Sequence, residues 1–204
     1  MFTGNQQRKT ERKMTALSSQ LLHGVHALAR DGESIFDTLE RVLNAIRPRP
    51  VIVRNVAFPP HTASGMWVAL DDMDILAIRE DAVDDEHRLV ILGHEVWHMM
   101  EGHCSAHAPA GQAATRAQSA ASVDMDELMG LVIQAVGRTP GVISPRVFDH
   151  AARTDFVLEA EAEAETFGLK LATSLRDWSR TRHRPDVHQV AGRIEASLRR
   201  GPWA

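Results

Sequence analysis

The segment that most restricts the fold of this chain is LVILGHEVWHMMEGHC, residues 89–104. It combines the apolar pattern of a core helix with three histidines, two glutamates and the only cysteine. On a helical wheel the apolar residues separate from a group of polar ones. The apolar side holds Leu89, Leu92, Val96, Met99 and Met100, and the polar side holds His94, His98 and Glu101. The pattern predicts an amphipathic helix whose apolar back packs on a sheet or on another helix.

Start and stop signals place the ends of this helix and of an earlier one. The acidic run at 84–86 favours a helix N-terminus, where negative charge stabilises the dipole, and Gly102 is typical of a helix end. We therefore expect the histidine-bearing helix at 84–102. Upstream, Ser34 is a candidate N-cap, and Pro48 stops the helix that follows it.

Three short segments rich in β-branched residues predict strands at 51–58, 66–70 and 74–80. The last two are joined by a short polar turn, which suits a tight hairpin. We expect a single α+β domain over residues 1–204, mostly helical, with a small three-stranded, mostly antiparallel sheet packed on the histidine-bearing helix. Its expected parts are N-terminal helices in 1–50 (one at 6–30), the sheet at 51–80, the helix at 84–102, a flexible loop at 105–122, and a helical part at 123–200 with helices at 123–137, 145–152, 155–177 and 186–200.

Composition narrows the class of protein. Hydrophobic residues make up 44% of the 204 residues, so the chain can bury a core without disulfides or other staples. The net charge of −4 gives no cationic field, and we expect no direct nucleic-acid binding. A single cysteine fits a reducing compartment. No secretory signal and no long apolar run is present, so we expect a cytoplasmic protein without a membrane span.

The sequence His94-Glu95-Val96-Trp97-His98 has the form HExxH. Residues four apart lie about 5–6 Å from each other on one helix face, so the two imidazoles can share one cation. A zinc ion held there lowers the pKa of a water toward about 7, and the intervening Glu95 can act as the general base. The motif therefore predicts a zinc site with the chemistry needed to hydrolyse a peptide bond.

Such a site needs a third protein ligand, and the residues leave several candidates. Near the helix end lie Glu101, His103, Cys104 and His107, but the spacing does not follow the HExxHxxGxxH pattern. A better source is the acidic helix expected at 155–177. It carries glutamates at 159, 161, 163 and 165, of which Glu159 and Glu163 share a face. We interpret Glu161 and Glu165 as solvent-facing.

The segments ILGHEVWHMMEGH and EAETFGLKLA resemble the ImmA/IrrE family of HExxH metallopeptidase-like proteins, and other segments resemble actinobacterial proteins labelled as toxin components of toxin–antitoxin systems. The resemblance implies a zincin-like fold, in which a helix after the HExxH helix supplies an acidic ligand. It places that ligand on Glu163, and Glu159, which shares its helix face, stays open as the alternative. It also implies that the partner is a helix-turn-helix regulator or an antitoxin.

Two functions follow from these expectations. The first is a zinc-dependent endopeptidase in which His94, His98 and Glu163 hold the metal and Glu95 is the base. A protein or peptide substrate would lie along an edge strand, with His61 or His150 as a candidate oxyanion donor. The second is a non-catalytic, metal-stabilised toxin or regulator that acts by binding another protein.

Overall fold

The computed structural model describes residues 4–102, 125–139 and 154–182. The observed elements agree with the predicted ones to within a few residues. In chain order they are α1 (Gly4–Leu28), α2 (Ile35–Ile46), β1 (Val51–Val56), β2 (Gly65–Ala69), β3 (Asp74–Arg79), α3 (Asp85–Glu101), α4 (Met125–Ala135) and α5 (Thr154–Arg182). The predicted loop at 105–122 and the predicted helices at 145–152 and 186–200 lie outside the described residues.

The predicted helix ends are present as side-chain and backbone caps. Ser34 caps α2 by accepting a hydrogen bond from the backbone of Phe36, and Asp84 caps α3 by accepting one from His87. Gly102 follows α3 in the left-handed conformation, with φ of 72°, and its N–H donates to the carbonyl of His98. The glycine allows this turn because it has no Cβ to clash.

The sheet is mixed, which corrects the prediction of a mostly antiparallel one. Its strand order is β1-β3-β2, so β3 lies in the centre. β2 and β3 form the expected antiparallel hairpin, whereas β1 runs parallel to β3 with Val51 opposite Asp74. β3 lies between β1 and β2 in the sheet, so the chain that leaves β1 must cross over to the other side of β3 before it enters β2. Alternating side chains look the same in either direction, so the sequence pattern did not reveal this pairing.

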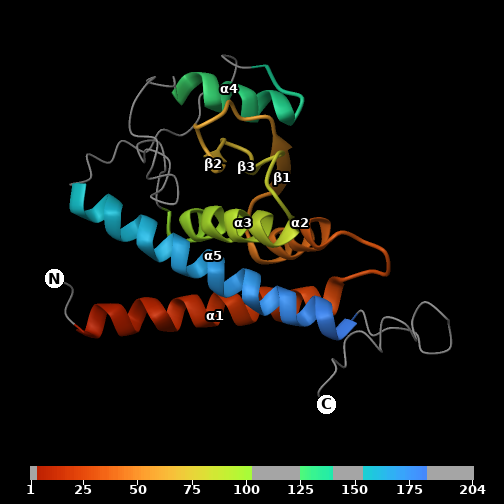
Figure 1. Cartoon of the computed structure of the whole chain (residues 1–204), viewed down its shortest axis with the longest axis vertical. Coiled ribbons are helices and arrows are strands. Elements are labelled where there is room, and N and C mark those ends of the chain that lie inside the picture. Colours follow the sequence, from red (N-terminus) through yellow and green to blue (C-terminus); the bar gives the residue numbers. More distant parts are fainter. Residues whose placement is uncertain (1–3, 103–124, 140–153, 183–204) are drawn as a thin grey trace, which may run out of the picture.

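Both faces of the sheet are covered by helices (Figure 1). Trp67, Leu76 and Ile78 turn toward α3 and belong to the larger core, which also includes residues of α1, α2 and α5. Met66, Val68 and Ile75 turn the other way and pack with Leu128 and Val132 of α4. Helix α3 is thus held between the sheet on one side and α5 on the other, and α5 in turn packs on α1.

Helices α3 and α5 run antiparallel and pack along most of their length. Glu86 near the start of α3 pairs with Arg176 toward the end of α5, with 2.8 Å between Oε1 and Nη1. Further along α3, the ring of Trp97 lies 5.1 Å from that of Phe167. Among the described residues, no helix is both long enough and apolar enough to cross a membrane.

Candidate metal centre

The two histidines of the HExxH sequence point to the same side of α3 and meet at their ring nitrogens. The Nε2 atoms of His94 and His98 lie 3.0 Å apart, and the ring centroids 4.7 Å apart. His98 is almost completely buried, with 1% of its surface exposed. Two imidazole nitrogens at this distance repel unless a proton or a cation lies between their lone pairs. The helix therefore presents a preformed pair of nitrogen donors.

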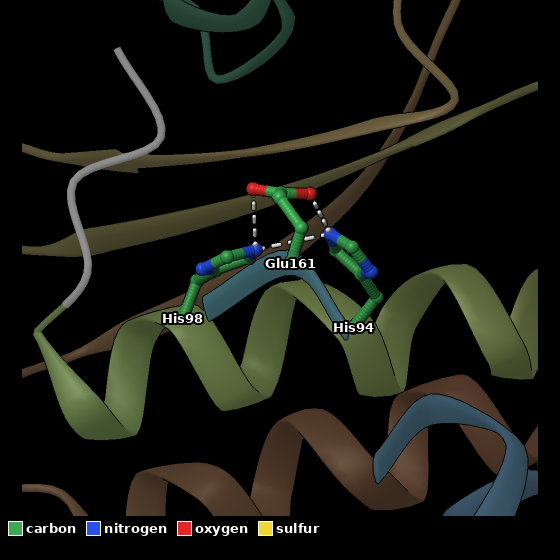
Figure 2. Close-up of side chains that lie close together, drawn as sticks. All are labelled: His94, His98 and Glu161. Carbon is green, nitrogen blue, oxygen red and sulfur yellow. Dashed lines mark hydrogen bonds and ion pairs between the residues drawn. The ribbon is translucent and has the colours of Figure 1, made fainter. Parts of the chain in front are cut away.

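The carboxylate that faces these nitrogens belongs to Glu161 of α5 (Figure 2). Its Oε2 lies 3.4 Å from Nε2 of His94, and its Oε1 lies 3.3 Å from Nε2 of His98. Donor atoms from all three residues lie within 4.8 Å of one another, so the group could hold a metal ion. The side chain of Glu161 is only 17% exposed, so our interpretation of this residue as solvent-facing is wrong.

The predicted third ligand, Glu163, lies elsewhere. Its Oε1 accepts a hydrogen bond of 3.1 Å from the hydroxyl of Thr10 in α1. Neither Glu163 nor Glu159 belongs to the group of potential ligands that the described residues form. Two positions along a helix correspond to a rotation of about 200°, so Glu161 and Glu163 face different neighbours. The helix that the sequence indicated does bring a carboxylate to the histidines, but from Glu161 instead of Glu163.

The other candidate residues are distributed as follows. Glu101 pairs with Lys13 of α1, with 2.5 Å between Oε2 and Nζ. His61 is exposed in the connection before β2, has a φ of 62°, and is not part of the group. His103, Cys104, His107 and His150 lie outside the described residues.

The charges of the group reinforce one another. Burial alone would raise the pKa of Glu161, but hydrogen bonds from His94 and His98 lower it to about 2. For His94, burial acts to lower the pKa, yet the hydrogen bond to Glu161 and the nearby charge of Glu95 outweigh it and raise the pKa above 6.5. The carboxylate of Glu161 is therefore ionised at neutral pH, and its charge favours the protonated form of His94.

The donor atoms lie close enough together to share one metal ion. In a tetrahedral zinc site with bonds of about 2.0–2.1 Å, neighbouring donor atoms lie about 3.3 Å apart. The two Nε2 atoms lie 3.0 Å apart, near that edge length, and each faces a different oxygen of Glu161, at 3.4 and 3.3 Å. Two histidines and one glutamate are also a ligand set found in catalytic zinc sites, which keep a fourth position for water. The residues present could thus hold a metal ion, and in number and type they suit zinc.

Glu95 lies next to this group but is held by the sheet. It is 5% exposed, and among the described residues no hydrogen-bond donor reaches its Oε2. Burial raises the pKa of Glu95, while His94 and His98 lower it, and the net shift is upward. A Cβ added to Gly65 of β2 would lie 2.9 Å from Oε1 of Glu95 and 2.6 Å from Cγ2 of Ile91. The missing side chain at position 65 therefore makes room for this carboxylate.

The sequence contained a signal for Glu161 that we did not use. Ala164, Phe167 and Leu171 are fully buried and define the side of α5 that packs into the core. Glu161 lies about one turn before Ala164 and about two turns before Gly168, which also contacts α3, so it extends the same face. Extending the apolar stripe of α5 toward its N-terminus would have selected Glu161 over Glu163.

Comparison with known proteins adds nothing to this description, because no family model, curated protein or solved structure matches the chain.

Proposed function

We propose that this chain is a zinc-dependent endopeptidase. The observation that carries the proposal is the convergence of His94, His98 and Glu161, whose donor atoms lie within 4.8 Å of one another. Glu95 lies beside them, buried and with a raised pKa. The ligands are those expected for a catalytic zinc of the HExxH type, and Glu95 is the residue that such a site uses as a base.

In this mechanism His94, His98 and Glu161 hold the metal. When bound, zinc supplies a Lewis acid that polarises a substrate carbonyl and lowers the pKa of a water. Glu95 would act as the general base, taking a proton from the attacking water and giving it to the amide nitrogen as the peptide bond breaks. A carboxylate with a pKa above 4.5 suits this role, because the best general base has a pKa close to the working pH.

The edge of the sheet offers a place for the substrate backbone. β2 is an outer strand of the described sheet. Within the hairpin, the N–H of Leu70 donates to the carbonyl of Met73, and the N–H of Arg79 donates to the carbonyl of Ser64. Backbone groups alternate along an antiparallel strand, so those of Gly65 and Trp67 face away from β3, and the backbone of Trp67 also hydrogen-bonds Glu95. An extended peptide can add to such an edge by hydrogen bonding. This supports a protein or peptide substrate over a small molecule.

We further propose that the chain belongs to the ImmA/IrrE-like proteins, and that its substrate or partner is a helix-turn-helix regulator or an antitoxin. The support is the resemblance of the HExxH segment and of EAETFGLKLA. Glu161 lies two residues before that second segment, and its carboxylate lies within 3.4 Å of the two histidines of the first.

A non-catalytic role is the second candidate. It is favoured by one observation, namely that the ligands come from α3 and α5, two helices that share the larger core. Zinc held there would also fasten these helices together, as a structural site does. A purely structural site, however, has no use for a buried Glu95 carboxylate whose Oε2 receives no hydrogen bond from the described residues.

The two candidates are separated by Glu95→Gln. The wild-type chain and this variant would each be loaded with zinc, analysed for metal content, and incubated with a peptide library whose cleavage is followed by mass spectrometry. We expect about one zinc per chain in both proteins, and a rate of cleavage about 100- to 10,000-fold lower in the variant. Equal cleavage by both proteins would contradict the catalytic role, and zinc-loaded wild-type protein without any cleavage would favour the non-catalytic one. His94→Ala, which removes a ligand, should lose the metal.

A further inference from the structure

The carboxylate of Glu161 reaches the histidines across the boundary between two helices, so its position depends on how closely those helices approach. At their crossing, Gly93 of α3 lies directly against Gly168 of α5. A Cβ added to Gly168 would lie 2.5 Å from the carbonyl oxygen of Val90 and 3.2 Å from the backbone nitrogen of His94. A Cβ added to Gly93 would lie 2.8 Å from Cα of Gly168. The two backbones are thus in direct contact, with no side chain between them.

This contact is rigid on both sides. The obstacles to a Cβ at position 168 are backbone atoms of α3, which cannot move without moving the helix that carries His94. On the neighbouring turn, the stacked rings of Trp97 and Phe167 are both fully buried, and they resist any sliding of α5 along α3. An added methyl group must therefore push the helices apart.

Glu161 lies on the same face of α5 as Gly168, about two turns away. A displacement of α5 at Gly168 is therefore carried to the carboxylate of Glu161. Its oxygens lie 3.3 and 3.4 Å from the two Nε2 atoms, which leaves little tolerance for a donor set that must fit bonds of about 2.0–2.2 Å.

From these contacts we infer that Gly168, together with Gly93, is a positioning residue of the metal centre: the glycine contact sets the distance from Glu161 to His94 and His98. The inference rests on the proposed metal site. Neither glycine has a side-chain atom that could bind a metal. The inference nevertheless gives both of them a role in metal affinity, separate from their role in stability.

The chain offers a matched control in Gly24 of α1. A Cβ there would lie 2.5 Å from Cγ1 of Val42 in α2, an overlap as short as the one at Gly168 but between helices that carry none of the ligands. Gly24→Ala and Gly168→Ala thus both strain a helix crossing in the core. Only the second strains the crossing that positions Glu161.

The experiment measures zinc dissociation constants of the full-length chain by competition with a chromophoric chelator. We expect Gly168→Ala to weaken zinc binding about 10- to 100-fold, the range found when residues that support metal ligands are lost. Gly24→Ala should bind zinc within about twofold of the wild type. In a Glu161→Ala background, adding Gly168→Ala should change the affinity by no more than about twofold, because the effect acts through Glu161.

Each other outcome overturns the inference. Unchanged affinity in Gly168→Ala shows that the contact does not set the site, and an equal loss in Gly24→Ala shows that the effect is general destabilisation. An undiminished effect in the Glu161→Ala background shows that it does not act through this carboxylate. If Gly168→Ala does not fold, Gly93→Ala tests the same contact with the smaller overlap of 2.8 Å and is judged by the same outcomes. A wild-type chain that binds no zinc overturns the proposed function and this inference together, whereas the other outcomes leave the proposed function intact.

Discussion

Two buried carboxylates, Asp74 and Glu95, both contact Trp67, Asp74 at its indole and Glu95 at its backbone, but the fold satisfies their hydrogen bonds to different degrees. Asp74 is fully buried and accepts hydrogen bonds from Arg47 at 2.7 Å and from the indole nitrogen of Trp67 at 3.1 Å, while Arg49 lies 3.8 Å away. Glu95 is nearly as buried, yet its Oε2 receives no hydrogen bond from any described residue.

The difference indicates that Asp74 has a structural role, whereas Glu95 is suited to a reactive one. A buried charge that is paired and hydrogen-bonded can hold elements together, here the end of α2, the start of β1 and the β2–β3 hairpin. A buried carboxylate left partly unsatisfied costs stability and is retained where its reactivity is needed. Stability should therefore depend on Asp74, and the chemistry of the metal centre on Glu95 and Glu161.

The largest expected effect is on the structural side of the comparison. Asp74→Asn removes the charge that Arg47 and Arg49 surround, and we expect the free energy of unfolding to fall by about 3 kcal/mol. Urea unfolding of the two proteins measures this difference. Asp72→Asn is the control in the same hairpin, because the Asp72–Arg138 pair is exposed and screened by solvent, and its loss should cost much less than the loss of Asp74. Equal costs for the two variants would remove the structural distinction of Asp74.

The second prediction concerns the ligands. Loss of a residue that only supports a metal ligand weakens metal binding roughly 10- to 100-fold. Glu161→Gln alters a proposed ligand itself, so it should weaken zinc binding by more than this. Glu163→Gln should leave it nearly unchanged, since an amide oxygen can still accept the hydrogen bond from Thr10. Zinc titration of both variants decides between the two glutamates. A greater loss in the Glu163 variant would restore the ligand that the sequence resemblance implied.

A third prediction addresses the space that holds Glu95. Gly65→Ala places a methyl group against Ile91 and Glu95, and overpacking of this kind costs about 1–3 kcal/mol. We expect it to reduce peptide cleavage more than zinc binding, because it displaces the base and not the ligands. Ala69→Gly is the control on the same face of β2 and should alter cleavage little. A Gly65→Ala protein with normal cleavage would show that Glu95 needs no such space.

The smallest expected effect is the stability difference between the metal-free wild type and Glu95→Gln. The folded-state pKa of Glu95 is raised above its ordinary 4.5, so the folded chain holds this proton more tightly than the unfolded chain does. The stabilisation from the protonated form is present below pH 4.5 and is lost as the pH rises through the folded-state pKa. Urea unfolding across this range should show the wild type losing stability relative to the variant as the pH increases. A stability difference between the two proteins that does not change with pH would mean that other interactions compensate for the burial of Glu95.

Much of the fold was accessible from the sequence because its elements have strong local signals. Ser34, Asp84 and Gly102 mark helix ends through contacts within a few residues, and the β2–β3 hairpin follows from a short turn. The parallel pairing of β1 with β3 was not accessible in this way. It depends on where the chain crosses over, and neither strand records that in its own side-chain alternation.

The candidate site likewise has a part that local sequence determines and a part that tertiary contacts determine. His94, Glu95 and His98 occupy one helix, so their mutual geometry follows from helical periodicity alone. The third carboxylate depends on which face of α5 meets α3, and that is decided by Gly93, Gly168 and the rings of Trp97 and Phe167. Tertiary contacts of this kind select Glu161 over Glu163, and their trace in the sequence is the apolar stripe of α5 that Glu161 extends.

The antiparallel crossing of α3 and α5 has a consequence for how the chain gains its final stability. His98 and Glu161 are far apart in the sequence, and zinc held by both would act as a reversible cross-link that closes the whole loop from residue 99 to residue 160. The three donors come together only in the folded chain, so zinc would stabilise that state by mass action. The concentration of available zinc would then set how much the ion adds to the core contacts that already hold α5 against α3.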